Sequence, residues 1–130
     1  MRILQPEGWP RPRGYSNGIE AEGRMVFVAG QIGWDEAEKF RASDFGGQFR
    51  QALANTLAVL KEASAGPEHV VRMTWFITSR EEYMSSLPAL GPAWKELMGR
   101  NYPTMAVIIV AGLVEPEAKI EIETTAVVPH

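Results

Sequence analysis

The chain has 130 residues, a length that suits a single domain built around one hydrophobic core. Its net charge of −3 and its scattered Lys and Arg residues argue against a nucleic-acid partner, because nucleic-acid-binding surfaces concentrate basic residues on one face. The absence of cysteine excludes disulfides, thiolate nucleophiles and cysteine-ligated metals, and it fits a cytoplasmic setting. No apolar run approaches the ~20 residues of a membrane-spanning helix, so we expect no membrane partner.

The first half of the sequence predicts an irregular arm, two strands and a helix. Residues 1–14 contain three prolines and are expected to lack regular structure. Residues 16–21 and 25–29 have β-forming sequences separated by turn residues. Apolar residues then recur every three or four positions from 45 to 60, which predicts a helix with one apolar face.

The second half predicts three more strands and a second helix. Residues 70–78 are rich in β-branched and aromatic side chains, and the helix that follows begins after a capping serine. This helix contains Pro88 and Pro92, which are expected to bend or split it. Residues 105–111 form an apolar strand, and residues 119–126 alternate with the period of two that is typical of a strand.

The order β-β-α-β-α-β-β predicts an α+β domain with a mixed sheet and two helices on one face. The strands at 25–29 and 105–111 are apolar at both parities, so both faces of the sheet are expected to be buried. Two helices can cover only one of these faces. The simplest cover for the other face is a second copy of the chain, and the pattern therefore predicts a homo-oligomer.

Six segments between residues 13 and 127 occur in the order and spacing of a known family. Arg13-Gly14-Tyr15-Ser16 is similar to an N-terminal G-P-Y-S element, with the Gly-Pro pair replaced. The other matching segments are Val26–Ile32, Gln48–Leu60, Val71–Thr78, Tyr102-Pro103 and Lys119–Glu123. Together they resemble the RidA/YjgF family of imine and enamine deaminases.

The resemblance implies a chorismate-mutase-like fold, a homotrimer, and sites in clefts between subunits. It also implies hydrolysis of small imines or enamines, such as 2-aminoacrylate, to a keto acid and ammonia with no metal or cofactor. The chemistry is consistent with this simplicity. An iminium carbon is already electrophilic, so the site need only orient the substrate, hold its carboxylate and position water.

The same resemblance assigns most of the candidate site residues, and Gly33 and Trp34 are added because they end and follow the glycine loop after residues 25–29. Family members hold the substrate carboxylate with an Arg two residues after the proline of the Y/F-P pair, and here that position is Met105. Methionine cannot bind a carboxylate, so substrate recognition is expected to differ. Two residues are expected to be catalytic, Tyr15 and Glu121, with Glu121 positioning water. Six residues are expected to contact substrate: Gly30, Gln31, Gly33, Trp34, Met105 and Val107.

Each candidate also has a structural reading. Glu121 can be a solvated strand residue, Tyr15 can pack on the sheet, and Trp34 can belong to the core or an interface. The two histidines lack partners at metal-ligand spacing, so no metal site is expected.

Two functions remain open, a deaminase with an altered site and a trimer that binds a small ligand without chemistry. A cation such as Arg13 or Arg24 reaching the Met105 pocket would favour a carboxylate substrate. An arginine placed at position 105 is expected to find its partner in Glu121.

Overall fold

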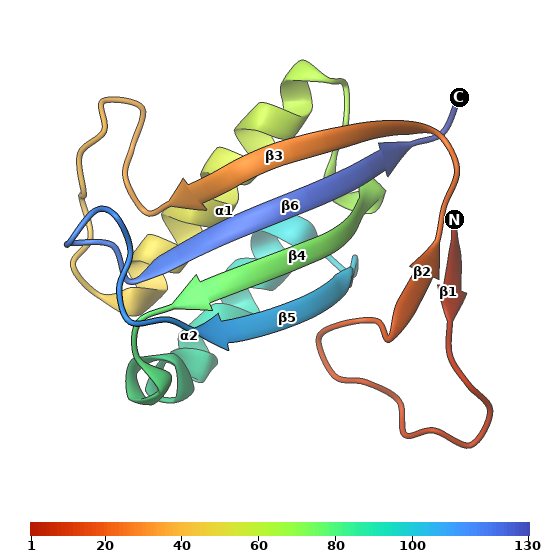
Figure 1. Ribbon diagram of the computed structural model, residues 1–130, viewed down its shortest axis with the longest axis horizontal. Helices are drawn as coiled ribbons and strands as arrows, with labels where there is room; N and C mark the ends of the chain where they lie inside the picture. Colours follow the sequence, from red (N-terminus) through yellow and green to blue (C-terminus); the bar gives the residue numbers. More distant parts are fainter.

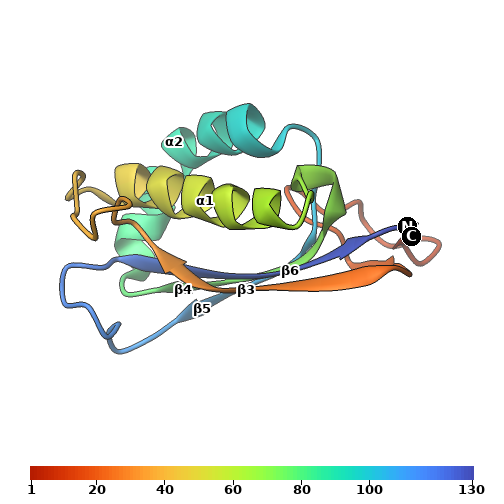
Figure 2. The same cartoon turned by 90° about the horizontal axis from the view of Figure 1, so that it is seen from above.

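Two helices cover one face of a four-stranded sheet, and a small two-stranded sheet lies beside it (Figures 1 and 2). This computed structural model describes residues 1–130 and confirms the predicted α+β class. The elements in chain order are β1 (Arg2–Leu4), β2 (Gly18–Glu20), β3 (Arg24–Ile32), α1 (Phe45–Glu62), the 3-10 turn η1 (Pro67–His69), β4 (Val70–Ile77), α2 (Arg80–Met98), β5 (Thr104–Ile109) and β6 (Ile120–Val128).

The main sheet is mixed and has the strand order β3-β6-β4-β5. Strand β6 pairs antiparallel with both β3 and β4, whereas β4 and β5 are parallel. Parallel neighbours need a crossover connection, and α2 supplies it by packing back across the sheet between the two strands. Strand β5 is therefore an edge strand, and apart from a single bridge between Ser16 and Thr104 its outer side has no partner within the chain (Figure 1).

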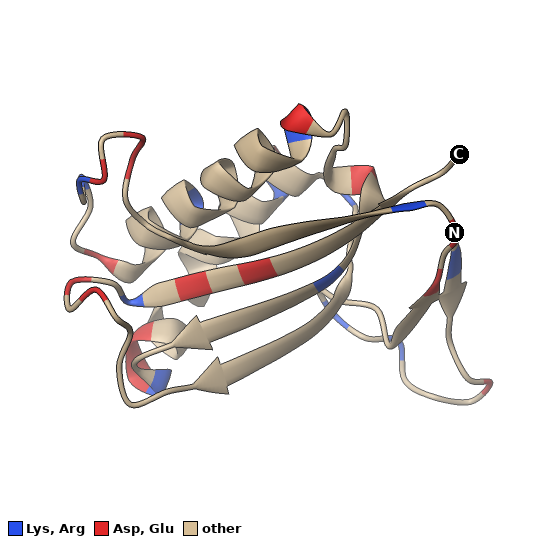
Figure 3. Cartoon of the chain, turned by 45° about the horizontal axis from the view of Figure 1, so that its top comes forward, with Lys and Arg blue, Asp and Glu red and all other residues tan.

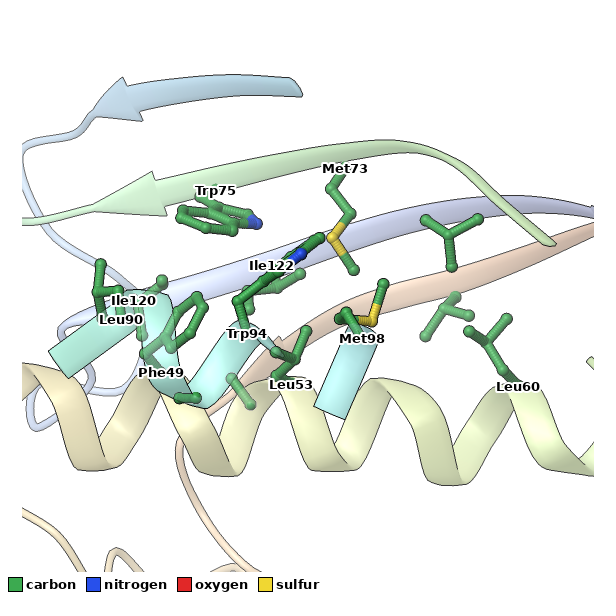
Figure 4. Packing of buried hydrophobic residues seen from close by; sticks show 14 of the residues in the cluster. Phe49, Leu53, Leu60, Met73, Trp75, Leu90, Trp94, Met98, Ile120 and Ile122 are labelled. Carbon is green, nitrogen blue, oxygen red and sulfur yellow. The ribbon is translucent and has the colours of Figure 1, made fainter. Parts of the chain in front are cut away.

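Helix α1 forms because its cap and its apolar spacing agree. The Asp44 carboxylate accepts a hydrogen bond from Gly47 N at 3.0 Å, which satisfies an N–H group of the first turn. Phe49, Leu53 and Leu60 recur along one face and are fully buried. They pack against the sheet and α2 in the close view of Figure 4, so the core lies between the helices and one sheet face.

Helix α2 is a single helix, so of the two effects expected of its prolines, a bend or a split, the split does not occur. A proline cannot donate the backbone hydrogen bond to the residue four positions earlier, so two helical bonds are missing. Pro88 and Pro92 both lie on the exposed side of the helix. Water can reach the carbonyl groups freed there, and the buried side is continuous through Leu90, Ala93 and Trp94.

The N-terminal arm is partly ordered, which corrects the prediction that residues 1–14 lack regular structure. Strand β1 pairs antiparallel with β2, and Arg2 forms an ion pair with Glu20 at 3.3 Å. The strand is only three residues long and ends before the first proline, so it lies below the length at which a sequence pattern identifies a strand. From Gln5 to Asn17 the arm has no regular secondary structure.

The other face of the main sheet has no helix over it (Figure 2). It carries large apolar side chains that are mostly exposed in the single chain, including Met25 at 61%, Phe27 at 71% and Ile108 at 44%. These side chains are exposed because the strands carry apolar residues at both odd and even positions, and the helices cover only one of the two faces. Neither helix is both long enough and apolar enough to cross a membrane.

Candidate functional site

An open cavity of about 430 Å³ lies where α2 passes over strands β4 and β5. Three of the sequence-predicted residues, Tyr15, Met105 and Val107, lie on its wall. Register explains the placement of the last two. Met105 pairs with Met73 and Val107 pairs with Trp75, and both partners point into the core between sheet and helices.

Five aromatic residues contribute to the wall of the cavity. Trp94 of α2 stacks on Tyr102 with 6.4 Å between ring centroids and 11° between planes, and it tilts against Trp75 of β4 at 6.0 Å. Tyr83, Leu87, Leu90 and Trp94 recur at helical spacing, which turns them all to one side of α2. The cavity therefore has an apolar floor on β4 and β5 and an aromatic side on α2.

The N-terminal arm closes one end of the cavity with Arg13, Gly14 and Tyr15. Ser16 fixes the arm there. Its backbone N–H donates to Pro103 O at 3.0 Å, and its hydroxyl donates to Tyr102 O. The side chain of Ser16 is buried, so this anchor holds Tyr15 beside the start of β5.

Two cations, Arg13 and Lys95, line the cavity together with no Asp or Glu. Neither cation forms an ion pair within the chain, although five other ion pairs occur elsewhere. Burial raises the pKa of the Tyr83 phenol above its ordinary value, so at neutral pH this group is a neutral hydrogen-bond donor. The cavity thus has a largely apolar lining that also carries two positive charges.

Glu121 lies on the opposite, uncovered face of the sheet. Its neighbours Ile120 and Ile122 are fully buried against the helices, so alternation turns Glu121 the other way, opposite Ile32 and Phe76. The acidic bands on β6 in Figure 3 interrupt strands that otherwise carry little charge. Within one chain Glu121 does not reach the Met105 cavity. A pairing of Glu121 with an arginine at position 105 would therefore need the Glu121 of another copy, and it stays a prediction.

Gly30 lies directly beneath the Glu121 carboxylate. A Cβ atom at Gly30 would come within 2.1 Å of Glu121 Oε1, so glycine is what allows the carboxylate to lie over the strand. A β-bulge between Val28 and Gln31 shifts the register with β6 at this point. Gln31 pairs with Ile122, and its side-chain amide bonds to Ala29 O at 3.1 Å. The bulge and the carboxylate together form a small polar feature on the uncovered face.

Gly33 and Trp34 have packing contacts in this chain and do not line the Met105 cavity. A Cβ atom at Gly33 would approach Gln48 Cα at 2.7 Å, so glycine allows the loop to lie against α1. The Trp34 ring packs on Phe40 with 6.0 Å between centroids. Asn55 of α1 holds the Trp34 backbone by donating to its carbonyl oxygen at 2.7 Å.

Sequence reasoning missed the part of the cavity that α2 contributes. The sequence analysis named none of Trp94, Tyr83 and Leu87 as a site residue. The i, i+4, i+7 and i+11 spacing identified an apolar helix face. It could not show that the face overhangs the edge strand β5 and so borders open space. Arg13 does reach this cavity, whereas Arg24 lies elsewhere and bonds to Ala63 O at 3.3 Å.

A larger open hollow of about 640 Å³ lies between the loop after β3 and the loop before β6. Its cations are already neutralised by carboxylates. Arg41 binds Asp35 at 2.7 Å, which lowers the pKa of Asp35, and Lys119 binds Glu82 at 2.9 Å. None of the predicted site residues lines this hollow, so we assign the candidate site to the Met105 cavity. No three His, Asp or Glu side chains gather closely enough to hold a metal ion.

This fold occurs in a known family. Residues 10–128 match the sequence model of the family described as endoribonuclease L-PSP, and the chain belongs to that family. It is similar to a RutC family protein from Synechocystis, with 32% identity over 99% of this chain and 98% of the relative. It is also similar to the 2-iminobutanoate/2-iminopropanoate deaminase of Salmonella typhimurium, with 30% identity over 87% of this chain and 86% of the enzyme.

A solved structure has the same fold over nearly the whole chain. The Rid protein family member YyfB from Yersinia pestis, described as a protein of unknown function, superposes with a TM-score of 0.84. Its identity is 32%, and 98% of each chain is covered. The resemblance to RidA/YjgF proteins noted from the sequence is therefore confirmed.

Proposed function

We propose that the protein is a cofactor-independent hydrolase of imines or enamines that acts in a cleft between the subunits of a homotrimer. The observation that carries the proposal is the cavity shared by Tyr15, Met105 and Val107, in a chain related to an iminobutanoate deaminase. Met105 occupies the position at which the family resemblance implies a carboxylate-binding Arg. Substrate recognition in this protein would therefore differ from that of the small-imine deaminases.

The reaction requires only proton transfer and hydrogen bonding from the protein. Water adds across the protonated C=N bond of a 2-imino acid, ammonia then leaves the carbinolamine, and a 2-keto acid remains. A carboxylate must accept a proton from the attacking water and return it to the leaving nitrogen. We assign that role to Glu121 and a hydrogen-bonding role to the Tyr15 hydroxyl. No redox step or covalent enzyme intermediate is needed.

The proposed trimer follows from the position of these groups. Glu121 lies on the uncovered sheet face, and the Met105 cavity opens beside the unpaired edge strand β5. A neighbouring copy that covers the exposed face around Phe27 could bring one subunit's Glu121 to the other's cavity. Burying large apolar side chains of this kind stabilises such an interface by roughly 1.5–3 kcal/mol per side chain. Light scattering should give about three times the 14.4 kDa chain mass, and a folded monomer at micromolar concentration would sink the proposal.

Activity can be measured with imino acids generated in situ by an amino-acid oxidase and trapped competitively by semicarbazide. The wild-type protein should reduce the yield of trapped imine. Glu121→Gln should lower this activity roughly a hundredfold or more, in line with the loss of a general base. Glu123→Gln is the matched control because it removes a more exposed carboxylate two residues along the same strand. Equal losses in both variants would exclude a specific role for Glu121.

Mixed trimers can test whether the site is shared between subunits. Glu121→Gln and Tyr15→Phe chains, each impaired alone, are unfolded together in equal amounts and refolded. If the two residues of one site come from different subunits, about a quarter of the sites in a random mixture regain both groups. If they come from the same subunit, no site regains both and activity stays at the level of the separate variants.

The alternative is a trimer that binds a small ligand without chemistry. The apolar cavity wall, with Met105 in place of a cation, is the observation that favours it. Saturable ligand binding by a trimer that leaves every tested imino acid unchanged would establish this alternative over the hydrolase.

A further inference from the structure

We propose that the Met105 cavity selects carboxylates that carry an aromatic side chain, and that Arg13 and Lys95 supply the positive charge for the carboxylate. The inference deepens the proposed function by naming its substrate class, the 2-imino acids with aromatic side chains. It concerns binding, however, and can be tested without turnover.

The size and lining of the cavity point to a flat, bulky ligand. Its volume of about 430 Å³ falls within the roughly 300–1,000 Å³ of pockets that enclose drug-sized molecules, so a three-carbon imino acid would leave much of it to water. The wall includes two indole rings, Trp75 and Trp94, which pack against each other with 6.0 Å between centroids and both border the cavity. Contacts between aromatic rings are favourable beyond the burial of apolar area, which favours an aromatic ligand over an aliphatic one of equal size.

The charge of the cavity points to an anion. The chain as a whole carries a net charge of −3, yet this cavity is lined by two cations and no carboxylate. Arg13 comes from the anchored arm and Lys95 from α2, so the two charges lie on different walls of one site. Arg11 and Arg100 line the adjoining hollow, which shares Tyr15 and Tyr102 with this cavity and also contains no acidic residue. The arm thus brings a cation to a site whose strand position 105 is apolar.

Two hydrogen-bond donors beside the cavity lack partners. The indole N–H groups of Trp75 and Trp94 are buried and have no acceptor within the chain. Buried donors without a partner are rare in folded proteins because each costs free energy. A bound ligand with oxygen acceptors is one means of satisfying such donors, and a carboxylate carries two oxygens.

The test uses three stable, unreactive probes and titration calorimetry on the intact protein. The probes are 3-phenylpropanoate, which has both features, propanoate, which lacks the ring, and 3-phenylpropan-1-ol, which lacks the charge. We expect 3-phenylpropanoate to bind at least tenfold more tightly than either of the others. Equal affinity for propanoate would overturn the aromatic part of the proposal, and equal affinity for the alcohol would overturn the carboxylate part.

Charge variants then test which residues hold the carboxylate. Arg13→Gln and Lys95→Gln should each weaken 3-phenylpropanoate binding by roughly three- to tenfold, because both side chains are exposed and water screens them. Neither should change affinity for the alcohol. Lys61→Gln is the control, since Lys61 is an exposed cation at the end of α1 far from this site in the fold. Unchanged binding in both cavity variants would refute the assignment.

Failure of this inference can be told apart from failure of the proposed function. Tight binding of 3-phenylpropanoate without hydrolysis of any imino acid would support the site and refute the enzyme. Hydrolysis of small imino acids with no preference for aromatic ones would support the enzyme and refute the inferred specificity.

Discussion

Replacing Gln48 by Met should destabilise the protein by about 2 kcal/mol. Gln48 is 1% exposed, and its amide group donates to Ala42 O at 3.2 Å and Glu117 O at 3.0 Å. Its oxygen accepts from Lys119 N at 2.8 Å, so one side chain connects three segments of the chain. Three hydrogen bonds at about 1 kcal/mol each give a loss of about 3 kcal/mol. Methionine fills the same space and recovers about 1 kcal/mol by burying apolar atoms.

Thermal unfolding followed by circular dichroism can measure this change. At an unfolding entropy of about 2.1 cal/mol/K per residue, the Gln48→Met variant should lose roughly 7 °C in Tm. Protein concentrations must be equal, because the Tm of an oligomer depends on concentration. Gln51→Met is the control on the same helix, where a half-buried amide makes one bond, to Asn55, and the cost should stay below about 1 kcal/mol.

A second substitution at the same position distinguishes hydrogen bonding from packing. Gln48→Glu keeps the acceptor for Lys119 N but turns a carboxylate oxygen toward two carbonyl oxygens. It should therefore be less stable than the Met variant at neutral pH, because a buried charge without a partner is more costly than a lost hydrogen bond. A Met variant within about 0.5 kcal/mol of wild type, or a Glu variant more stable than the Met variant, would refute the reasoning.

Four further predictions concern Tyr83, Asn55, Gly33 and Gly91. Because burial raises the pKa of Tyr83, part of the tyrosinate absorbance should appear above pH 10, and Tyr83→Phe should remove that part. The stability contribution of this phenol is present below its unfolded pKa of about 10 and is lost as pH rises through its folded pKa, so wild type should lose more stability above pH 10 than Tyr83→Phe. The Asn55 side-chain amide donates to Ile32 O at 3.0 Å and to Trp34 O at 2.7 Å. Asn55→Ala should therefore lower the free energy of unfolding by about 1–3 kcal/mol and speed hydrogen exchange in residues 32–34. Gly33→Ala should cost about 1–3 kcal/mol in urea unfolding, because its Cβ would meet the backbone of α1. Gly91→Ala, with nothing within 4 Å of the new atom, should instead stabilise α2 by up to about 1 kcal/mol.

The sequence predicted the main elements because each carried a strong periodic signal. Helix α1 has both a capping residue and a continuous apolar face, and β6 alternates along its length. Strand β1 carried no such signal, since three residues cannot establish a period. The sequence also could not show that α2 continues through its two prolines. Whether Pro88 breaks a helix depends on which side faces solvent, and that is set by tertiary packing.

The candidate site was predictable only in part, because its geometry depends on strand register. The alternating sequence predicted that Glu121 lies on the other face of its strand from Ile120 and Ile122, and β6 has that arrangement. It could not show that Met105 pairs with Met73 and so faces the helices. Register between β4 and β5 is fixed by the crossover through α2 and not by any local pattern. The sequence alone could therefore not show whether Met105 and Glu121, which lie on different strands, face the same side of the sheet.

Met105 and Glu121 lie on opposite faces of the sheet, and this separation bears on the role of the face that no helix covers. The backbone of the sheet lies between the two side chains, and β4 lies between their strands. No side-chain rotation within one chain can bring the Glu121 carboxylate to a ligand in the Met105 cavity. Hydrolysis requires a proton acceptor within hydrogen-bond reach of the attacking water. If both residues serve one reaction, they must therefore come from different copies of the chain. The exposed apolar residues around Phe27 provide a physical reason for such copies to associate.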